Sequence, residues 1–382
     1  MITTRILQRM DWLLVSLVIA VSLFGVLMVA GSMHNSWEAA LASEFFRSQV
    51  VWVLAGIVLM FAVTILDYRY LRHVMPVIYG VNIALLVGVI YRGVEAGGAR
   101  RWLHLGPLGL QPSELAKVLV IITLAHFLAG KEEDGPDTGW CAFALSALHV
   151  ALPAALVLIQ PDLGTSLVFV AIWFGSLYFA GFLLIRLLGV FALGMGTAVG
   201  AVVAHVRYAI EVPFLRDHMV ARLISFLDPS LDPTGAGYQL KQSILAIGSG
   251  GMTGNGLFRG ASSQLNFLPE QHTDFIFSAI GEQLGFVGTT GLLVAFTLIL
   301  LRMLLVLIGA KDRFGTILVG GVIAYLFFHV LVNVGMTMGV MPVTGLPLPF
   351  ISYGRSAFLS EMIAVGLVLN VGGRRIRERI RF

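Results

Sequence analysis

The sequence has few charged residues and only one cysteine. Asp, Glu, Lys and Arg make up 12% of the 382 residues, whereas soluble domains carry about 25%. The single cysteine, Cys141, excludes an intrachain disulfide and a cysteine-based metal cluster. No Walker A sequence is present, which argues against ATP-driven work. The net charge of +4 is small and gives little support to nucleic-acid binding.

Apolar sequence dominates instead. Hydrophobic residues make up 58% of the chain, in continuous runs long enough to cross a hydrocarbon core of about 30 Å. Outer-membrane barrels alternate apolar and polar residues, so continuous runs indicate helices. We therefore expect an all-α polytopic membrane protein that forms one domain over residues 1–382. About ten transmembrane helices are expected, near 12–32, 50–66, 74–91, 114–129, 143–160, 164–181, 184–205, 275–305, 315–340 and 356–372.

The positions of lysine and arginine predict the orientation. With the N-terminus in the cytoplasm, most of these residues fall in inner loops, as the positive-inside rule requires. Examples are Arg69, Arg72 and Lys311. The basic tail 373–382 would then lie against anionic headgroups, which supports the same assignment. Both termini are therefore expected in the cytoplasm.

Three segments rich in glycine and proline then face outward, namely 92–113, 206–274 and 341–355. The largest, 206–274, joins helices 7 and 8 and has structural signals of its own. Leu240, Ile244 and Ile247 recur at helical spacing and predict a short amphipathic helix. Its apolar content argues against a floppy linker. We expect this segment to lie on the membrane and fold back over the helices.

Asp274 is the first candidate for chemistry, because it lies just before an apolar run at the outer membrane level. A reduced dielectric there would raise its pKa toward that of a general base. The sequence supports a second interpretation equally well. In that interpretation Asp274 complements the helix dipole and Thr273 is the N-cap.

Two further polar segments lie at the outer ends of spans. Glu114 and Lys117 share a helix face after Pro112. They form either an internal ion pair in a capped span or part of a cavity, and charges inside a membrane usually face a cavity or a partner. Asp162, in a short turn between two spans, either caps the next helix or faces the same cavity.

Arg100 and Arg101 precede Trp102, a combination that suits a lipid phosphate or pyrophosphate. Interfacial anchoring of Trp102 is the alternative. The segment 343–354 contains prolines and cannot be a regular helix. Non-helical backbone at membrane depth is tolerated beside protein or a wet cavity, so this segment is a predicted wall of the site. A cavity lined by both charge signs and open to lipid suits an anionic lipid-linked substrate.

Several long motifs resemble those of the SEDS family (shape, elongation, division and sporulation) of bacterial cell-wall proteins. They are QPSELAK at 111–117, QPDLGTS at 160–166, FLDPSLDPTGAGYQLKQSILAIGSGGMTGNG at 226–256, FLPEQHTDFIF at 267–277 and MPVTGLPLPFISYG at 341–354. The resemblance runs from the first span to about residue 372. The motif sequences resemble those of the elongation members of this family more than those of the division members.

The resemblance implies a peptidoglycan glycosyltransferase that polymerises lipid II during elongation. It implies a location in the bacterial cytoplasmic (inner) membrane, with the active site on the extracytoplasmic side. Asp274 matches the essential aspartate of the family's TDF motif, which suggests a general base in a single inverting displacement. The candidate substrate-binding residues are Arg101, Trp102, Glu114, Lys117, Asp162, Lys241, His272 and Ser352.

The resemblance also implies a class B penicillin-binding protein as transpeptidase partner. Other elongation-complex membrane proteins and membrane lipids are expected partners as well, and nucleic acid is not. A divalent cation, Mg or Mn, would assist the leaving group, although the sequence has no dedicated metal-ligand pattern.

The chain departs from the family pattern in two places. Arg355 stands where the family usually has a glycine, and Glu282-Gln283 stands where paired glutamates are frequent. Three other functions stay open. They are a lipid II flippase or transporter, a scaffold that only activates its partner, and a division-type polymerase. Inverted repeats would favour a transporter, and no clear internal repeat is present.

Overall fold

The computed structural model describes residues 8–96, 99–105, 108–130, 138–208, 217–260 and 267–374. Residues 375–382 of the basic tail lie outside the described residues, so the expectation for the tail stays a prediction. Asn266, which directly precedes the motif at 267–277, lies outside them as well.

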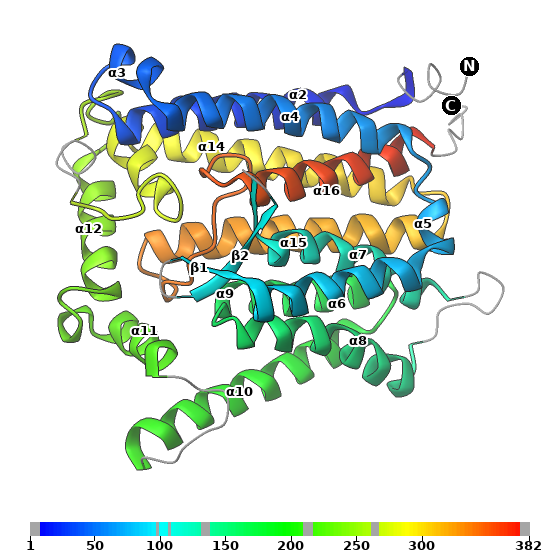
Figure 1. Ribbon diagram of the computed structural model, residues 1–382. Helices are drawn as coiled ribbons and strands as arrows, with labels where there is room; N and C mark the ends of the chain where they lie inside the picture. Colours follow the sequence, from blue (N-terminus) through cyan, green and yellow to red (C-terminus); the bar gives the residue numbers. More distant parts are fainter. Residues whose placement is uncertain are drawn as a thin grey trace.

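Helices dominate the structure (Figure 1). In the described part of the chain, nine helices are long and apolar enough to cross a membrane. They are α2 (Trp12–Met33), α4 (Glu44–Ile65), α6 (Met75–Arg92), α7 (Pro112–Ala129), α8 (Trp140–Ile159), α10 (Leu184–Tyr208), α14 (Ile276–Ile308), α15 (Arg313–Thr337) and α16 (Arg355–Gly373). The tenth predicted span is the apolar helix α9 (Leu163–Phe179), which has 17 residues. The all-α polytopic fold is confirmed.

Helix boundaries follow capping residues that hydropathy does not detect. The second span was predicted from about residue 50, but α4 begins at Glu44, where Ser43 accepts a hydrogen bond from the Phe45 amide at 3.2 Å. The first turns of α4 contain polar residues, so the hydropathy pattern placed the start of the span too late. Asp312 caps α15 in the same way, by accepting from the Gly315 amide at 2.7 Å.

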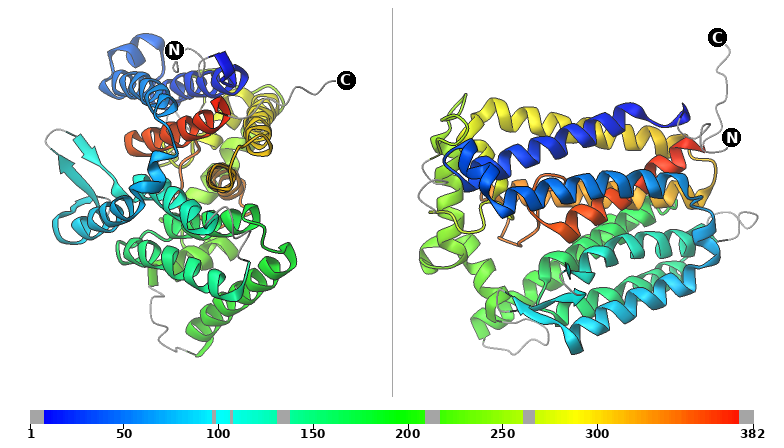
Figure 2. Two further views of the ribbon diagram at one scale, coloured as in Figure 1. Left: turned by 90° about the vertical axis from the view of Figure 1, so that its right-hand side faces the viewer. Right: turned by 45° about the horizontal axis from the view of Figure 1, so that its top comes forward.

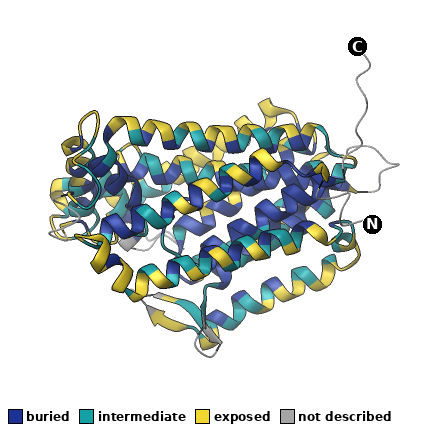
Figure 3. Cartoon of the chain, turned by 90° about the horizontal axis from the view of Figure 1, so that it is seen from above, coloured by how far each residue is buried: buried dark blue, intermediate teal, exposed yellow. Residues whose placement is uncertain are grey.

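The most buried helices are α7, α15 and α16. Figure 3 shows the buried residues in dark blue, surrounded by more exposed helices. α16 packs against α4 and α7, and α15 packs against α7, α9 and α14. By contrast, α10 lies at the edge of the molecule, where Leu187 is its one buried residue. Its exposed apolar side chains suit contact with lipid rather than with water.

The loop 92–113 contains a small antiparallel sheet that the sequence analysis did not predict. Its strands are β1 (Val94–Ala96), β2 (Ala99–Leu105) and β3 (Leu108–Leu110), in the order β1-β2-β3. Val94 pairs with Trp102, and Leu103 pairs with Leu110. β1 and β3 have three residues each, and the seven residues of β2 do not alternate strictly between apolar and polar. The sheet projects from the side of the helices in the left view of Figure 2.

The short helices divide the molecule into two ends (Figure 1). One end carries α3 (Trp37–Ala42), α11 (Asp217–Leu227), the 3-10 helix η2 (Pro229–Leu231) and α12 (Ala236–Ser249). The other end carries α5 (Tyr70–His73), the start of α2 and the end of α16. The three segments predicted to share one face therefore do lie at one end.

The segment after α10 folds back over that end, as predicted. The amphipathic helix expected around Leu240 is α12, and Leu240 packs with Leu268, Phe275 and Val343 in a small buried cluster. Ser243 donates a hydrogen bond from Oγ to the Thr337 carbonyl at 2.7 Å. The large loop is thus attached to both α14 and α15.

Candidate active site

Asp274 lies in a tight turn just before α14. The amides of Thr273 and Phe275 both donate to the Glu270 carbonyl at 3.2 Å, and Glu270 itself has a φ of 54°. Asn333 of α15 donates from Nδ2 to the Asp274 carbonyl at 2.8 Å and to the Leu346 carbonyl at 2.7 Å. These bonds fix the backbone of Asp274 against α15, while its side chain is half-buried.

The structure decides against the capping interpretation of this turn. The residue at the N-cap of α14 is Phe275, and no side chain caps this helix. Thr273 instead donates from Oγ1 to the Glu270 side chain at 3.0 Å. Thr273 as N-cap is therefore wrong, and the carboxylate of Asp274 is not used to hold the first turn.

The surroundings of Asp274 shift its ionisation strongly. Burial, with the neighbouring carboxylates of Glu270 and Asp162, raises the pKa of Asp274 to about 7, although Arg222 and Arg101 act in the opposite direction. Burial and the nearby Arg101 lower the pKa of Arg222, while the two aspartates raise it. Asp274, Asp162 and the two arginines thus share one electrostatic environment.

Arg101 is held at the start of α9. Its Nη1 lies 3.8 Å from Asp162 Oδ2, its Nε donates to the Gln160 carbonyl at 3.2 Å, and its Nη2 donates to the Pro161 carbonyl. Asp162 also caps α9 by accepting from the Thr165 amide at 3.1 Å. The capping interpretation of Asp162 is therefore confirmed, and the same carboxylate also lies beside Arg101 rather than beside Lys117.

The loop between α15 and α16 is non-helical and forms a wall of the site, as predicted. Gly345 has a φ of 74°, and a Cβ there would lie 3.3 Å from Asp274 Oδ2. Arg222 donates from Nη1 to the Thr344 carbonyl at 3.4 Å. Ser352 accepts from the Leu348 amide at 2.8 Å and donates to the Thr273 carbonyl at 2.7 Å. These two hydrogen bonds link this loop to the Asp274 turn. Ser352 is buried at this junction, with 5% of its surface exposed.

Glu114 and Lys117 form an ion pair of 2.7 Å, as one interpretation predicted. Lys117 is completely buried, and its Nζ also lies 3.2 Å from Nε2 of His329. Nδ1 of His329 lies 3.2 Å from the Pro347 carbonyl. Through His329 and Pro347, this cluster contacts the loop between α15 and α16 on its buried side. Its contacts do not include the side chain of Asp274.

The remaining predicted residues lie around this centre. The His272 ring contacts the rings of Tyr353 and Phe45, with centroids at 5.8 and 6.3 Å. Burial lowers the pKa of His272. Trp102 is half-buried on β2. Lys241 is exposed on α12 and makes no hydrogen bond or ion pair within the described residues. The structure therefore does not bring Lys241 to the Asp274 cluster.

Both departures from the family pattern have structural roles. The Arg355 guanidinium lies 5.8 Å from the ring of Trp52 on α4, so it stacks between helices. Gln283 donates from Nε2 to the Gly31 carbonyl at 2.9 Å and links α14 to α2. Neither contact touches Asp274.

The comparison with known families agrees with this geometry. The family described as "Cell cycle protein", which groups FtsW, RodA and SpoVE, matches residues 9–376. The chain belongs to the FtsW/RodA/SpoVE family. This is the family that the motifs of the sequence resemble.

Two curated relatives and one solved structure show how close the similarity is. Peptidoglycan glycosyltransferase RodA of Treponema pallidum is 34% identical, with 96% of this chain and 98% of the relative covered. Peptidoglycan glycosyltransferase MrdB of Escherichia coli K12 is 38% identical over 85% of this chain and 84% of the relative. A structure described as "Structural coordination of polymerization and crosslinking by a peptidoglycan synthase complex" matches with a TM-score of 0.79 and 34% identity. That match covers 97% of this chain and 99% of the other.

Within this FtsW/RodA/SpoVE chain, the described residues contain no group of three His, Cys, Asp or Glu side chains that would hold a metal ion. Asp162 lies 3.8 Å from Arg101, and Asp162 and Asp274 both act electrostatically on Arg222. Magnesium in proteins is frequently held by one or two carboxylates together with substrate phosphates. The donor set fits that mode and not a cage made only of protein.

The sequence analysis missed Arg222 as a site residue and counted it only as a loop charge. A signal was present, because Arg222 follows the apolar residues Met219 and Val220 in a helix that is amphipathic. His329, Asn333 and Glu361 were missed as well; the Glu361 carboxylate accepts from the Phe350 amide at 2.8 Å in the loop before α16. Each lies inside a predicted apolar span, where a polar residue is a functional candidate by default.

Proposed function

We propose that this protein is a peptidoglycan glycosyltransferase that polymerises lipid II into glycan strands during cell elongation. The observation that carries the proposal is the half-buried Asp274, with a pKa of about 7, beside Arg101 and Arg222. A base near neutrality next to two cations suits sugar transfer from a pyrophosphate-linked donor. The names of the curated relatives support the same reaction.

In this mechanism Asp274 is the general base. Its carboxylate accepts the proton from the 4-hydroxyl of the acceptor sugar as that oxygen attacks the anomeric carbon of the donor. The bond from this carbon to the pyrophosphate oxygen breaks, and undecaprenyl pyrophosphate leaves with the electron pair. One displacement converts an α-linked donor into a β-linked product, so one base is sufficient and no sugar–enzyme intermediate forms.

Arg101 and Arg222 offset the charge that develops on the departing pyrophosphate. Arginine suits this role because its planar fork matches phosphate oxygens. Lys117 is already paired with Glu114 and enclosed, so we assign it to positioning the wall through His329 and Pro347. When a divalent cation accompanies the pyrophosphate, Asp162 and Asp274 are the carboxylates that would hold it, and it would add positive charge at the leaving group.

The test uses purified protein, labelled lipid II and moenomycin, with and without a class B penicillin-binding protein. We expect polymer from the wild type in the presence of moenomycin and none from Asp274→Asn. Glu38→Gln is the matched control, because Glu38 is an exposed carboxylate at the same end of the molecule. A wild-type rate in Asp274→Asn would contradict the role of base.

The same assay separates the alternative functions. Lipid II translocation into vesicles without polymer would support a flippase. Polymer that depends on the partner's own catalytic residues would support a scaffold. Imaging against a division marker tests the elongation role.

We further propose that the protein works in the bacterial cytoplasmic membrane with both termini inside and Asp274 outside. The distribution of lysine and arginine supports this orientation. We also propose a class B penicillin-binding protein as its transpeptidase partner, which the similarity to a chain of a peptidoglycan synthase complex supports.

A further inference from the structure

A polar cavity lies at the end of the molecule opposite Asp274. Its volume is about 540 Å³, and it is lined by Arg69, Arg72, His73, His126, Lys311 and Asp312. These residues come from α5, from the last turn of α7 and from the turn between α14 and α15. The helix α14 runs from Asp274 at one end to Lys311 at the other. Its 33 residues would span about 50 Å as a continuous helix, so the two sites lie at opposite ends of the helices.

Among the residues that the structure describes, the lining of this cavity is dominated by positive charge. Three of its side chains are permanent cations, two are histidines and one is a carboxylate. That carboxylate, Asp312, is already engaged. It accepts from the Tyr68 hydroxyl at 2.8 Å and from the Gly315 amide at 2.7 Å, and it lies 3.7 Å from Nε of Arg69.

Aromatic rings hold the arginines in place. Tyr68 and Phe314 are buried and stacked, with ring centroids 5.9 Å apart. The Arg69 guanidinium lies 5.9 Å from the Tyr68 ring, and the Arg72 guanidinium lies 5.9 Å from the Phe314 ring. Arg72 also donates from Nη2 to the Gly130 carbonyl at 3.4 Å. Arginines oriented in this way lose little conformational freedom when they bind an anion.

Two buried nitrogen atoms of the described lining, Nε of Arg69 and Nδ1 of His126, make no hydrogen bond, and Nε of Arg69 has only its 3.7 Å contact with Asp312. Nδ1 of His126 is buried and has no hydrogen-bond partner among the residues that the structure describes. Buried polar atoms in native proteins are nearly always paired, so this nitrogen is available to a group that enters the cavity.

A role in membrane topology alone does not account for these features. The positive-inside rule requires only lysines and arginines in short loops. It requires neither a concave site nor aromatic support beneath the guanidinium groups. The cavity lies at the ends of α7 and α14, where membrane-crossing helices meet the headgroup region.

We propose that this cavity binds a phosphate group, supplied either by the headgroup of an anionic phospholipid or by a soluble phosphate ester. The ligand is bound through Arg72, Lys311 and His126, across the membrane from the reaction centre.

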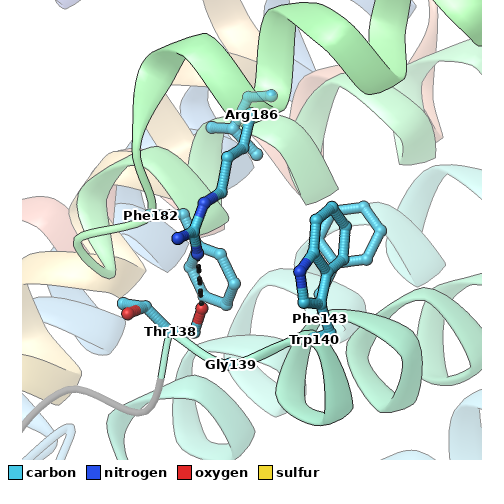
Figure 4. Close-up of a pocket in the computed structure, with 7 residues that line it drawn as sticks. Thr138, Gly139, Trp140, Phe143, Phe182 and Arg186 are labelled. Atoms are coloured by element: carbon cyan, nitrogen blue, oxygen red, sulfur yellow. Dashed lines mark hydrogen bonds between the residues drawn. The ribbon is translucent and has the colours of Figure 1, made fainter.

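The experiment measures binding of two probes to the purified full-length protein. Native mass spectrometry counts bound short-chain phosphatidylglycerol, and calorimetry follows inorganic phosphate. The variants are Lys311→Gln and the double variant Arg72→Gln with Lys311→Gln. The control is Arg186→Gln, because Arg186 is an exposed arginine that lies beside Thr138 and Phe182 in a separate small pocket (Figure 4).

We expect the double variant to bind its probe at least tenfold more weakly than the wild type, and Arg186→Gln to bind as the wild type does. Loss of lipid binding alone identifies a headgroup site, and loss of phosphate binding identifies a soluble ligand. If the double variant does not elute as a single species, Lys311→Gln alone is the test, because Lys311 is exposed and its loss removes no hydrogen bond seen in the described residues. Equal binding of both probes by wild type and variants overturns the proposal.

Discussion

At the scale of single residues, the reactive property of Asp274 comes from its surroundings. The same carboxylate in water would be ionised well below neutral pH. Burial and the nearby acids Glu270 and Asp162 move its pKa to about 7. Two arginines limit this rise, so that Asp274 can accept a proton and still be ionised at physiological pH.

The first prediction concerns the pH dependence of polymerisation. Because the base must be ionised, the rate should fall about tenfold per pH unit below its pKa and level off above it. With a pKa of about 7, the acid limb should begin near neutrality. The measurement is kcat/KM for lipid II between pH 5.5 and 8.5. A profile that is flat over this range would refute the assignment.

The raised pKa also predicts an effect on stability. A carboxyl group whose pKa is higher in the folded state favours unfolding above its unfolded pKa, and the effect is complete once the pH exceeds the folded value. Asp274→Asn should therefore raise the thermal midpoint more at pH 8 than at pH 5. This measurement is independent of catalysis.

The second prediction concerns Arg222. Its removal takes away a cation beside the proposed leaving group, so Arg222→Gln should lower kcat by about 10²-fold. Arg222→Lys should lower kcat less than Arg222→Gln does. Lysine keeps the positive charge but lacks the planar guanidinium that can donate two hydrogen bonds to one phosphate. The matched control is Arg207→Gln, an exposed arginine at the end of α10. An equal effect of both glutamine variants would indicate general electrostatics instead of a local role.

At the scale of elements, the interruption of α14 joins the outer loop to the membrane helices. Gly285 has φ 64° and ψ −161° inside this helix. The amides of Phe286 and Val287 donate instead to the carbonyls of Gly251 and Met252, at 2.9 and 3.1 Å. The amides that lose their hydrogen bonds within α14 at this interruption are therefore bonded to the loop instead.

The third prediction tests this junction. A Cβ on Gly285 would lie 2.4 Å from the Gly254 nitrogen and would also require a conformation that is essentially restricted to glycine. Gly285→Ala should destabilise the protein by about 2 kcal/mol or more. The readout is the thermal midpoint in detergent.

The control lies in the same helix. Gly291→Ala would place its Cβ in open space, so its effect should be neutral or slightly stabilising. Equal midpoints for the two variants would show that the interruption carries no strain.

At the scale of the whole molecule, the two ends of the helices differ in composition and function. The Asp274 centre occupies one end, and the cavity lined by Arg72 and Lys311 occupies the other. The core between them is built from α7, α15 and α16.

The fourth prediction tests which end faces the cytoplasm. Cys141 is exposed at the start of α8, at the same end as α5. A membrane-impermeant maleimide should label it only after the membrane is opened. Thr234→Cys, at an exposed position between η2 and α12 in a Cys141→Ser background, should be labelled in intact spheroplasts. The reverse pattern would invert the proposed topology.

The sequence alone determined the class of the protein, the ten apolar helices and part of the site. Hydropathy and capping act over a few residues, so they can be recognised in a local window. Asp274, Asp162 and Arg101 were identified because each lies in a motif of its own. The sheet that carries Arg101 was missed, since its strands are short.

Only the tertiary structure decided which of these groups act together. Arg222 and Thr344 are 122 positions apart along the chain, yet the Arg222 side chain donates a hydrogen bond to the Thr344 carbonyl beside Asp274. Ser352 and Lys117 were expected to contact substrate, but the fold places them where they hold the wall. Such contacts depend on distances between remote segments, and these are fixed by helix packing rather than by local sequence.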